Sequence, residues 1–143
     1  MGMTTIVYGY IREPRTGCAK VEQMLESNKK QIESLPETDE YPFLVRGLFS
    51  FSDVSYRNRL IHFAGGYKQL ESYWADWLAK FEALLAQLFW ERVRLHLITE
   101  WTEEFTYDWA AAATIKDSFR SGSPLPTTIW QHKGGPRDDI GKR

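Results

Sequence analysis

Residues Leu70 to Trp101 read LESYWADWLAKFEALLAQLFWERVRLHLITEW, and two different hydrophobic periods follow one another in this stretch. In its first part, apolar residues recur every three or four positions, the spacing of one helix face. In its second part, they alternate with polar residues, the spacing of a half-buried strand. We therefore predict a helix from about Gln69 to Leu88 that leads directly into a strand from about Trp90 to Trp101. The apolar helix face comprises Leu70, Tyr73, Trp74, Trp77, Leu78, Phe81, Leu84, Leu85 and Leu88, and the apolar strand positions are Val93, Leu95, Leu97 and Trp101.

Towards the N-terminus, the β-rich segment Ile6–Ile11 predicts a first strand, which Pro14 should end because proline cannot donate to a ladder. A helix from about residue 17 to residue 35 follows, with Thr16 as its N-cap and Pro36 as its stop. The stripe of this helix is Cys18, Val21, Leu25, Asn28, Ile32 and Leu35, with Asn28 expected at the edge of the apolar face.

The remaining segments predict a second strand over Phe43–Phe51 and a third over about 57–63, which the pair Gly65-Gly66 should break. Further along, Phe105, Tyr107 and Trp109 alternate again and predict another strand. A short helix is expected over Ala110–Phe119, and Gly134–Arg143 is typical of a flexible tail.

This order of elements is β-α-β-β-α-β followed by an added strand. It predicts an α+β fold, a ferredoxin-like sandwich with an antiparallel sheet and both helices on one face. We expect a single domain over residues 1–122 and a C-terminal extension, partly flexible, over 123–143. The other sheet face must then be solvated, covered by the extension or covered by a partner.

Composition limits the function classes. The 143 residues carry 18 basic and 19 acidic side chains, and the net charge of −1 argues against a general nucleic-acid binder. A single cysteine, Cys18, excludes an intramolecular disulfide and fits a reducing compartment. No signal peptide and no apolar run of membrane-spanning length is apparent, so we expect a cytoplasmic protein without a membrane partner. Aromatic residues make up 15% of the chain, which suggests a tightly packed core or a surface patch that needs a partner.

No catalytic motif stands out, and we predict no catalytic residues, no metal and no cofactor. His62 and His96 lie on predicted strands and could form a metal or acid–base site if they shared a face, but no third ligand has metal spacing. Basic residues on neighbouring strands could bind an anion or RNA. The segment Trp90–Leu97 lacks paired stacking aromatics between its basic residues, which argues against RNA. The basic residues concerned are Arg46, Arg57, Arg59, Arg92 and Arg94.

Two acidic segments are the predicted partner-binding surface. Carboxylates interleaved with large aromatics suit a protein interface, because aromatics anchor a partner and carboxylates steer a basic one. An ordinary solvated edge strand would show the same pattern. Because carboxylates are costly to bury, we expect them to face solvent. The predicted residues are Glu37, Asp39 and Glu40 in the first segment, and Glu100, Trp101, Glu103, Glu104, Phe105, Tyr107 and Asp108 in the second.

The compact chain, the early segment IVYGYI (Ile6–Ile11), the aromatic helix YWADW (Tyr73–Trp77) and the acidic loops together resemble small immunity proteins encoded beside polymorphic bacterial toxins, including those of contact-dependent inhibition systems. The resemblance covers most of the chain. It implies a non-enzymatic inhibitor that binds a cognate toxin and blocks its active site. The near-neutral net charge departs from the acidic character common in inhibitors of nucleases.

Two other functions stay open. One is a small ferredoxin-like enzyme or ligand-binding protein with a pocket between the helices and the sheet, into which Trp74, Trp77 and Phe81 would project. The other is a purely structural subunit. The sequence also leaves open whether the chain forms a homo-oligomer.

Overall fold

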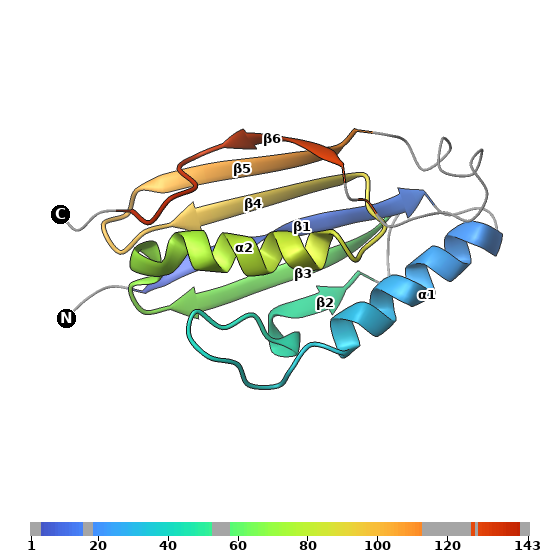
Figure 1. The fold of residues 1–143 in the computed structure, drawn as a ribbon, viewed down its shortest axis with the longest axis horizontal. Helices are drawn as coiled ribbons and strands as arrows, with labels where there is room; N and C mark the ends of the chain where they lie inside the picture. The colour runs from blue at the N-terminus through green and yellow to red at the C-terminus, as the bar shows by residue number, and fades with distance from the viewer. Residues whose placement is uncertain (1–3, 16–18, 53–57, 113–126, 128, 141–143) are drawn as a thin grey trace.

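The computed structural model describes residues 4–15, 19–52, 58–112, 127 and 129–140. They form a six-stranded antiparallel sheet in the order β2-β3-β1-β4-β5-β6, and helix α2 lies across one face of it (Figure 1). The strands are β1 (Thr5–Arg15), β2 (Phe49–Phe51), β3 (Asn58–Tyr67), β4 (Arg92–Ile98), β5 (Glu104–Ala111) and β6 (Trp130–Gly134). The helices are α1 (Ala19–Glu33) and α2 (Trp74–Leu85), with short 3-10 helices η1 (Arg46–Leu48) and η2 (Leu70–Tyr73).

The predicted α+β class, with an antiparallel sheet and helices, is confirmed. The six-strand order is longer than the four-strand order of a ferredoxin-like sandwich, since β5 and β6 continue the sheet beyond β4. The finer ferredoxin-like assignment therefore stays a prediction. Among the described helices, none is long and apolar enough to cross a membrane.

Helix α2 supplies the centre of the core. Its sequence, WADWLAKFEALL, contains no glycine, proline or β-branched residue, which favours a helix. Every residue of the predicted apolar face is buried except Tyr73, which is 43% exposed. Trp77 stacks between Trp74 and Phe81, with ring centroids 5.3 and 5.1 Å away. The predicted aromatic stripe is thus core packing.

Helix α1 packs on the same side of the sheet as α2. Its Ile32 belongs to the core cluster that includes Trp77 and Val7, while Val21 and Met24 pack with Phe89. Asn28, predicted at the edge of the apolar face, is instead fully buried. Thr16 and Cys18 lie outside the described residues.

The sheet has one covered and one open face, as strand alternation requires. On β1, Val7 and Ile11 are buried, whereas Ile6 and Tyr8 are 40% and 41% exposed. On β4, Val93, Leu95 and Leu97 are buried as predicted, but the strand ends at Ile98 and leaves Trp101 outside.

Pro14 does not end β1, so that prediction is wrong. The strand reaches Arg15 because its register shifts between Arg12 and Arg15. Glu13 and Pro14 together face the single residue Arg59 there, which is the arrangement of a β-bulge. A proline is tolerated at a bulge because the ladder is already interrupted.

The second and third strands also differ from prediction. Phe43–Phe51 is strand only over Phe49–Phe51, since η1 precedes it. In contrast, β3 continues through Gly65-Gly66 as far as Tyr67. Gly65 pairs with Val7, and a Cβ at Gly65 would lie 2.6 Å from a methyl carbon of Leu48. The glycine there permits close packing rather than a break.

The C-terminal extension adds a strand, β6, and a segment after it, residues 135–140, which we call the C-terminal strap. Strand β6 pairs with β5, and it lies within the predicted C-terminal extension and contains His132. The following residues cross the start of α2, where Asp139 Oδ1 accepts the Ala75 N–H at 2.9 Å and Ile140 N donates to Glu71 O at 2.8 Å. Residues 134–140 are therefore packed on the domain rather than a flexible tail.

The predicted helix over Ala110–Phe119 is wrong at its start, because Ala110 and Ala111 belong to β5. Its remainder from residue 113 lies outside the described residues.

Candidate functional site: an aromatic end

The turn between β4 and β5 presents Trp101 to solvent at 61% exposure. Buried Thr99 organises the turn, since its hydroxyl accepts the N–H groups of Trp101 and Glu103 at 3.3 and 3.1 Å. Thr99 N also donates to Glu103 O at 2.9 Å. Thr102 adopts a left-handed φ of 63°, and its N–H donates to Thr99 O. These bonds hold the exposed indole on a fixed turn, which lowers the entropy lost on binding a partner.

Two buried carboxylates lie behind this turn. Glu100 is 9% exposed, and its Oε1 accepts the N–H of Gln69 at 2.8 Å. Glu71 is 7% exposed, accepts the N–H of Glu100 at 2.9 Å and accepts the hydroxyl of Thr5. The expectation that Glu100 faces solvent is wrong, because the backbone N–H of Gln69 compensates the burial of its carboxylate. These bonds join the β4–β5 turn to the start of η2 and to β1.

The loop that carries the first acidic segment reaches the same end of the molecule. Tyr41 donates its hydroxyl to Lys68 O, and its ring meets that of Tyr73 edge-on at 5.4 Å. Burial raises the pKa of Tyr41, and the nearby Glu71, Tyr73 and Glu100 raise it further. Tyr41 and Tyr73 are 41% and 43% exposed. We call Tyr41, Tyr73 and Trp101 the aromatic end.

Within this loop, Asp39 has a structural role. It accepts Lys80 Nζ at 2.9 Å and the Leu44 N–H at 3.0 Å, and the Lys80 hydrogen bond lowers the pKa of Asp39. Lys80 also donates to the carbonyls of Glu40 and Pro42, so it fastens the loop to α2. Glu37 forms an ion pair with Arg46.

The ten predicted partner-binding residues therefore separate into groups. Glu37, Asp39, Glu40, Trp101 and Glu104 are exposed, and Glu103 and Phe105 are half-buried. Tyr107 and Glu100 are buried, and Tyr107 donates its hydroxyl to Pro136 O. Asp108 lies on the open sheet face, where it pairs with Arg94 at 3.0 Å.

Sequence reasoning missed Tyr41 and Tyr73. Tyr73 was assigned to the apolar face, and Tyr41 lay in a loop considered only for its charges.

The two strand histidines do share the open face, but β1 separates them. His62 pairs with Tyr10 and His96 with Tyr8 in the strand registers. Within the part of the chain that the structure describes, no group of three His, Cys, Asp or Glu residues could hold a metal ion. Absence of a metal stays a prediction.

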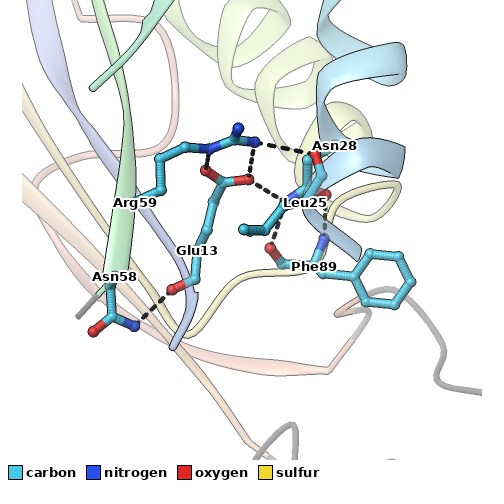
Figure 2. Close-up of polar contacts among 6 residues, drawn as sticks. All are labelled: Glu13, Leu25, Asn28, Asn58, Arg59 and Phe89. Atoms are coloured by element: carbon cyan, nitrogen blue, oxygen red, sulfur yellow. Dashed lines mark hydrogen bonds and ion pairs between the residues drawn. The ribbon is translucent and has the colours of Figure 1, made fainter. Parts of the chain in front are cut away.

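A buried polar network, shown in Figure 2, lies near the C-terminal end of β1, whereas the aromatic end adjoins its N-terminal end. Glu13, fully buried, accepts two bonds from Arg59 and one from Asn28 Nδ2 at 2.9 Å. Asn28 also donates to Phe89 O and accepts Phe89 N, each at 2.8 Å. Arg59 further donates to Leu25 O at 3.1 Å. Both carboxylate oxygens are used, so the network fixes α1 to the sheet rather than offering a reactive group.

Between α2 and the β2 side of the sheet, the space lined by Val7, Leu44, Phe63 and Trp77 is filled by side chains and leaves no room for a water molecule. The pocket between helices and sheet stays a prediction.

No family model matches the chain, and no curated protein or solved structure is significantly similar to it.

Proposed function

We propose that the protein is a non-enzymatic binding module that engages a protein partner through the aromatic end. The observation that carries the proposal is the exposure of Trp101, Tyr41 and Tyr73 on segments fixed by hydrogen bonds. Large aromatics held rigidly at a surface are the usual anchors of protein interfaces.

The charges around the aromatic end favour a basic partner. Three carboxylates are exposed there, those of Asp76 in the first turn of α2, Glu40 and Glu104, against the exposed base Lys68. Lys80 is engaged with Asp39 and the nearby loop carbonyls. Carboxylates at the edge of an interface speed association with a cationic partner and lose that effect as salt is added. Glu100 takes no part in this steering, since it is buried.

The more specific proposal is an immunity-type inhibitor that neutralises a cognate bacterial toxin. Its support is the resemblance of the IVYGYI and YWADW segments, together with a rigid aromatic surface and acidic edges suited to covering a basic active site. We also propose that β1 to β4 and the two helices follow the ferredoxin-like plan, with β5 and β6 as additions. The order β2-β3-β1-β4 supports this proposal. The cytoplasm is the proposed location, because the single cysteine Cys18 allows no intramolecular disulfide.

The test compares the wild type with Trp101→Ala/Tyr73→Ala as bait in the native host. Captured proteins are identified by mass spectrometry and expressed singly in a test bacterium. We expect one of them to arrest growth, with rescue by the wild-type chain but not by the double variant. The matched control is Lys29→Ala on the exposed face of α1, which should rescue fully.

The electrostatic part of the proposal has its own measurement. The variant Asp76→Lys/Glu104→Lys should associate with the captured partner about tenfold more slowly at low salt, equivalent to roughly 1.4 kcal/mol. Circular dichroism checks its folding. Full rescue by a folded Trp101→Ala/Tyr73→Ala variant would remove the aromatic end as the interface. An unchanged association rate for the charge variant would overturn the steering of a basic partner.

A further inference from the structure

The open sheet face carries an ordered array of aromatic and basic side chains. Register places Tyr10 of β1 between His62 of β3 and Arg94 of β4. One step along, Tyr8 stands opposite His96 of β4. These side chains point away from the face that packs against α1 and α2, and no described segment covers them.

Tyr8 and His96 form a stacked platform. Their ring centroids are 4.9 Å apart with an interplanar angle of 23°. His96 Nδ1 lies 3.2 Å from the hydroxyl of Thr106, which holds the imidazole in place. Tyr8 keeps 41% of its surface exposed, so one side of the platform is free to stack with another flat ring.

Beside Tyr8 the face is hollowed. A shallow cavity of about 290 Å³ lies among β1, β2, β3 and η1. Gly9 and Ala64 are the small residues at this point, and His62 and Ser50 contribute polar groups to its lining. The hollow combines an aromatic wall with hydrogen-bonding groups, which suits a planar ring with polar edges such as a nucleobase.

Three arginines lie along the same face. The side chains of Arg12, Arg92 and Arg94 are 44%, 46% and 41% exposed. They share two carboxylates: Arg12 lies 3.5 Å from Glu91, and Asp108 lies 3.8 and 3.0 Å from Arg92 and Arg94. The cluster keeps one unbalanced positive charge, and each guanidinium has more N–H donors than these contacts use. Such donors are suited to phosphate oxygens.

We propose that the open sheet face binds single-stranded nucleic acid. A base stacks on Tyr8 in the hollow, and the adjoining phosphates lie along Arg94, Arg92 and Arg12. Sequence composition argues against nucleic-acid binding because the chain is nearly neutral overall. The fold changes that expectation by concentrating basic and aromatic groups on one face.

The test is fluorescence anisotropy with labelled oligothymidine and oligouridine of about ten nucleotides. We expect the wild type to bind both at about 50 mM salt and to lose about tenfold in affinity at about 200 mM. Tyr8→Ala should weaken binding at least about tenfold, since base stacking is lost. Tyr8→Leu, which keeps the apolar bulk, should show the same loss and serves if the alanine variant does not fold.

Controls separate this site from the aromatic end. Lys29→Ala and Trp101→Ala/Tyr73→Ala should bind the oligonucleotides like the wild type, and Arg94→Gln should reduce the dependence on salt. No binding at about 100 μM protein in low salt, a concentration at the upper limit of ordinary non-specific affinity, would overturn the proposal. Equal affinity of a folded Tyr8 variant would also overturn it. So would sedimentation showing a dimer that Tyr8→Ala dissociates, because the face would then bind a second copy.

Discussion

Trp77 is a core side chain whose truncation should cost several kcal/mol of stability. It is 1% exposed, stacks on Trp74 and Phe81, and donates its indole N–H to Tyr67 at 3.1 Å. Trp77→Ala should lower the free energy of unfolding by about 3–5 kcal/mol, measured by chemical denaturation. The control is Tyr73→Ala, which should cost about 1 kcal/mol or less, because Tyr73 is 43% exposed and lies outside the buried core. Similar losses in both variants would contradict this account of the core.

For single residues, the spacing of apolar positions along the sequence predicts which apolar side chains are buried. It does not predict which polar side chains are buried. The spacing of Trp77 and Phe81 identifies core positions directly. Asn28 and Glu100 are buried because distant backbone groups satisfy them, namely those of Phe89 and Gln69. No local pattern encodes those partners, so the sequence could not separate Glu100 from the exposed Glu104.

Helix α1 depends on polar contacts as well as on its apolar stripe. Arg59→Met would leave Glu13 buried without its cationic partner. We expect a loss of about 3–5 kcal/mol in unfolding free energy, the cost of breaking a buried pair by removing one partner. The matched variant Arg46→Met breaks the exposed pair with Glu37 and should cost about 1 kcal/mol or less. Chemical denaturation of the two variants compares their losses of unfolding free energy. Equal midpoints would show that the buried pair stabilises the fold no more than the exposed pair does.

The C-terminal strap supplies a cap to α2 from a distant part of the chain. Asp139→Ala removes the acceptor for the Ala75 N–H in the first turn. By analogy with the loss of an N-cap, thermal or chemical denaturation should show a cost of about 1 kcal/mol. Asp138→Ala, at the exposed neighbouring position, is the control. An unchanged stability for Asp139→Ala would mean that solvent replaces the carboxylate at no cost.

The sequence predicts whether a segment is helix or strand where its apolar periodicity extends over many residues. It does not predict where the element begins and ends. Pro14 and Gly65 are strand breakers by local rules, yet a bulge accommodates the first and close packing against Leu48 the second. Strand β6 was missed because its sequence, WQHKG, has no apolar alternation. Its place at the sheet edge is determined by pairing with β5.

Across the whole molecule, two core tyrosines link stability to alkaline pH. Burial raises the pKa of both Tyr67 and Tyr107 to about 12. The unfolded chain ionises its tyrosines near pH 10, so it releases protons that the folded state retains. Stability should be fully present below about pH 10 and decline towards about pH 12. Ultraviolet titration of tyrosinate should show Tyr67 and Tyr107 among the late-ionising groups, and Tyr67→Phe should remove one late-ionising group. Ionisation of all tyrosines near pH 10 in the folded protein would contradict the burial.

Strand β1 is central in the sheet and is bonded on both sides by strands that come much later in the chain. Ile6 pairs with Gly66 on one side and with Ile98 on the other. The β4–β5 hairpin, in contrast, closes locally between Ile98 and Glu104. Long loops must close before β1 gains its ladder, and non-local pairing of this kind slows folding to roughly the millisecond-to-second range. Until β1 inserts, both β3 and β4 carry an unpaired edge, so the refolding chain is most open to aggregation during that interval.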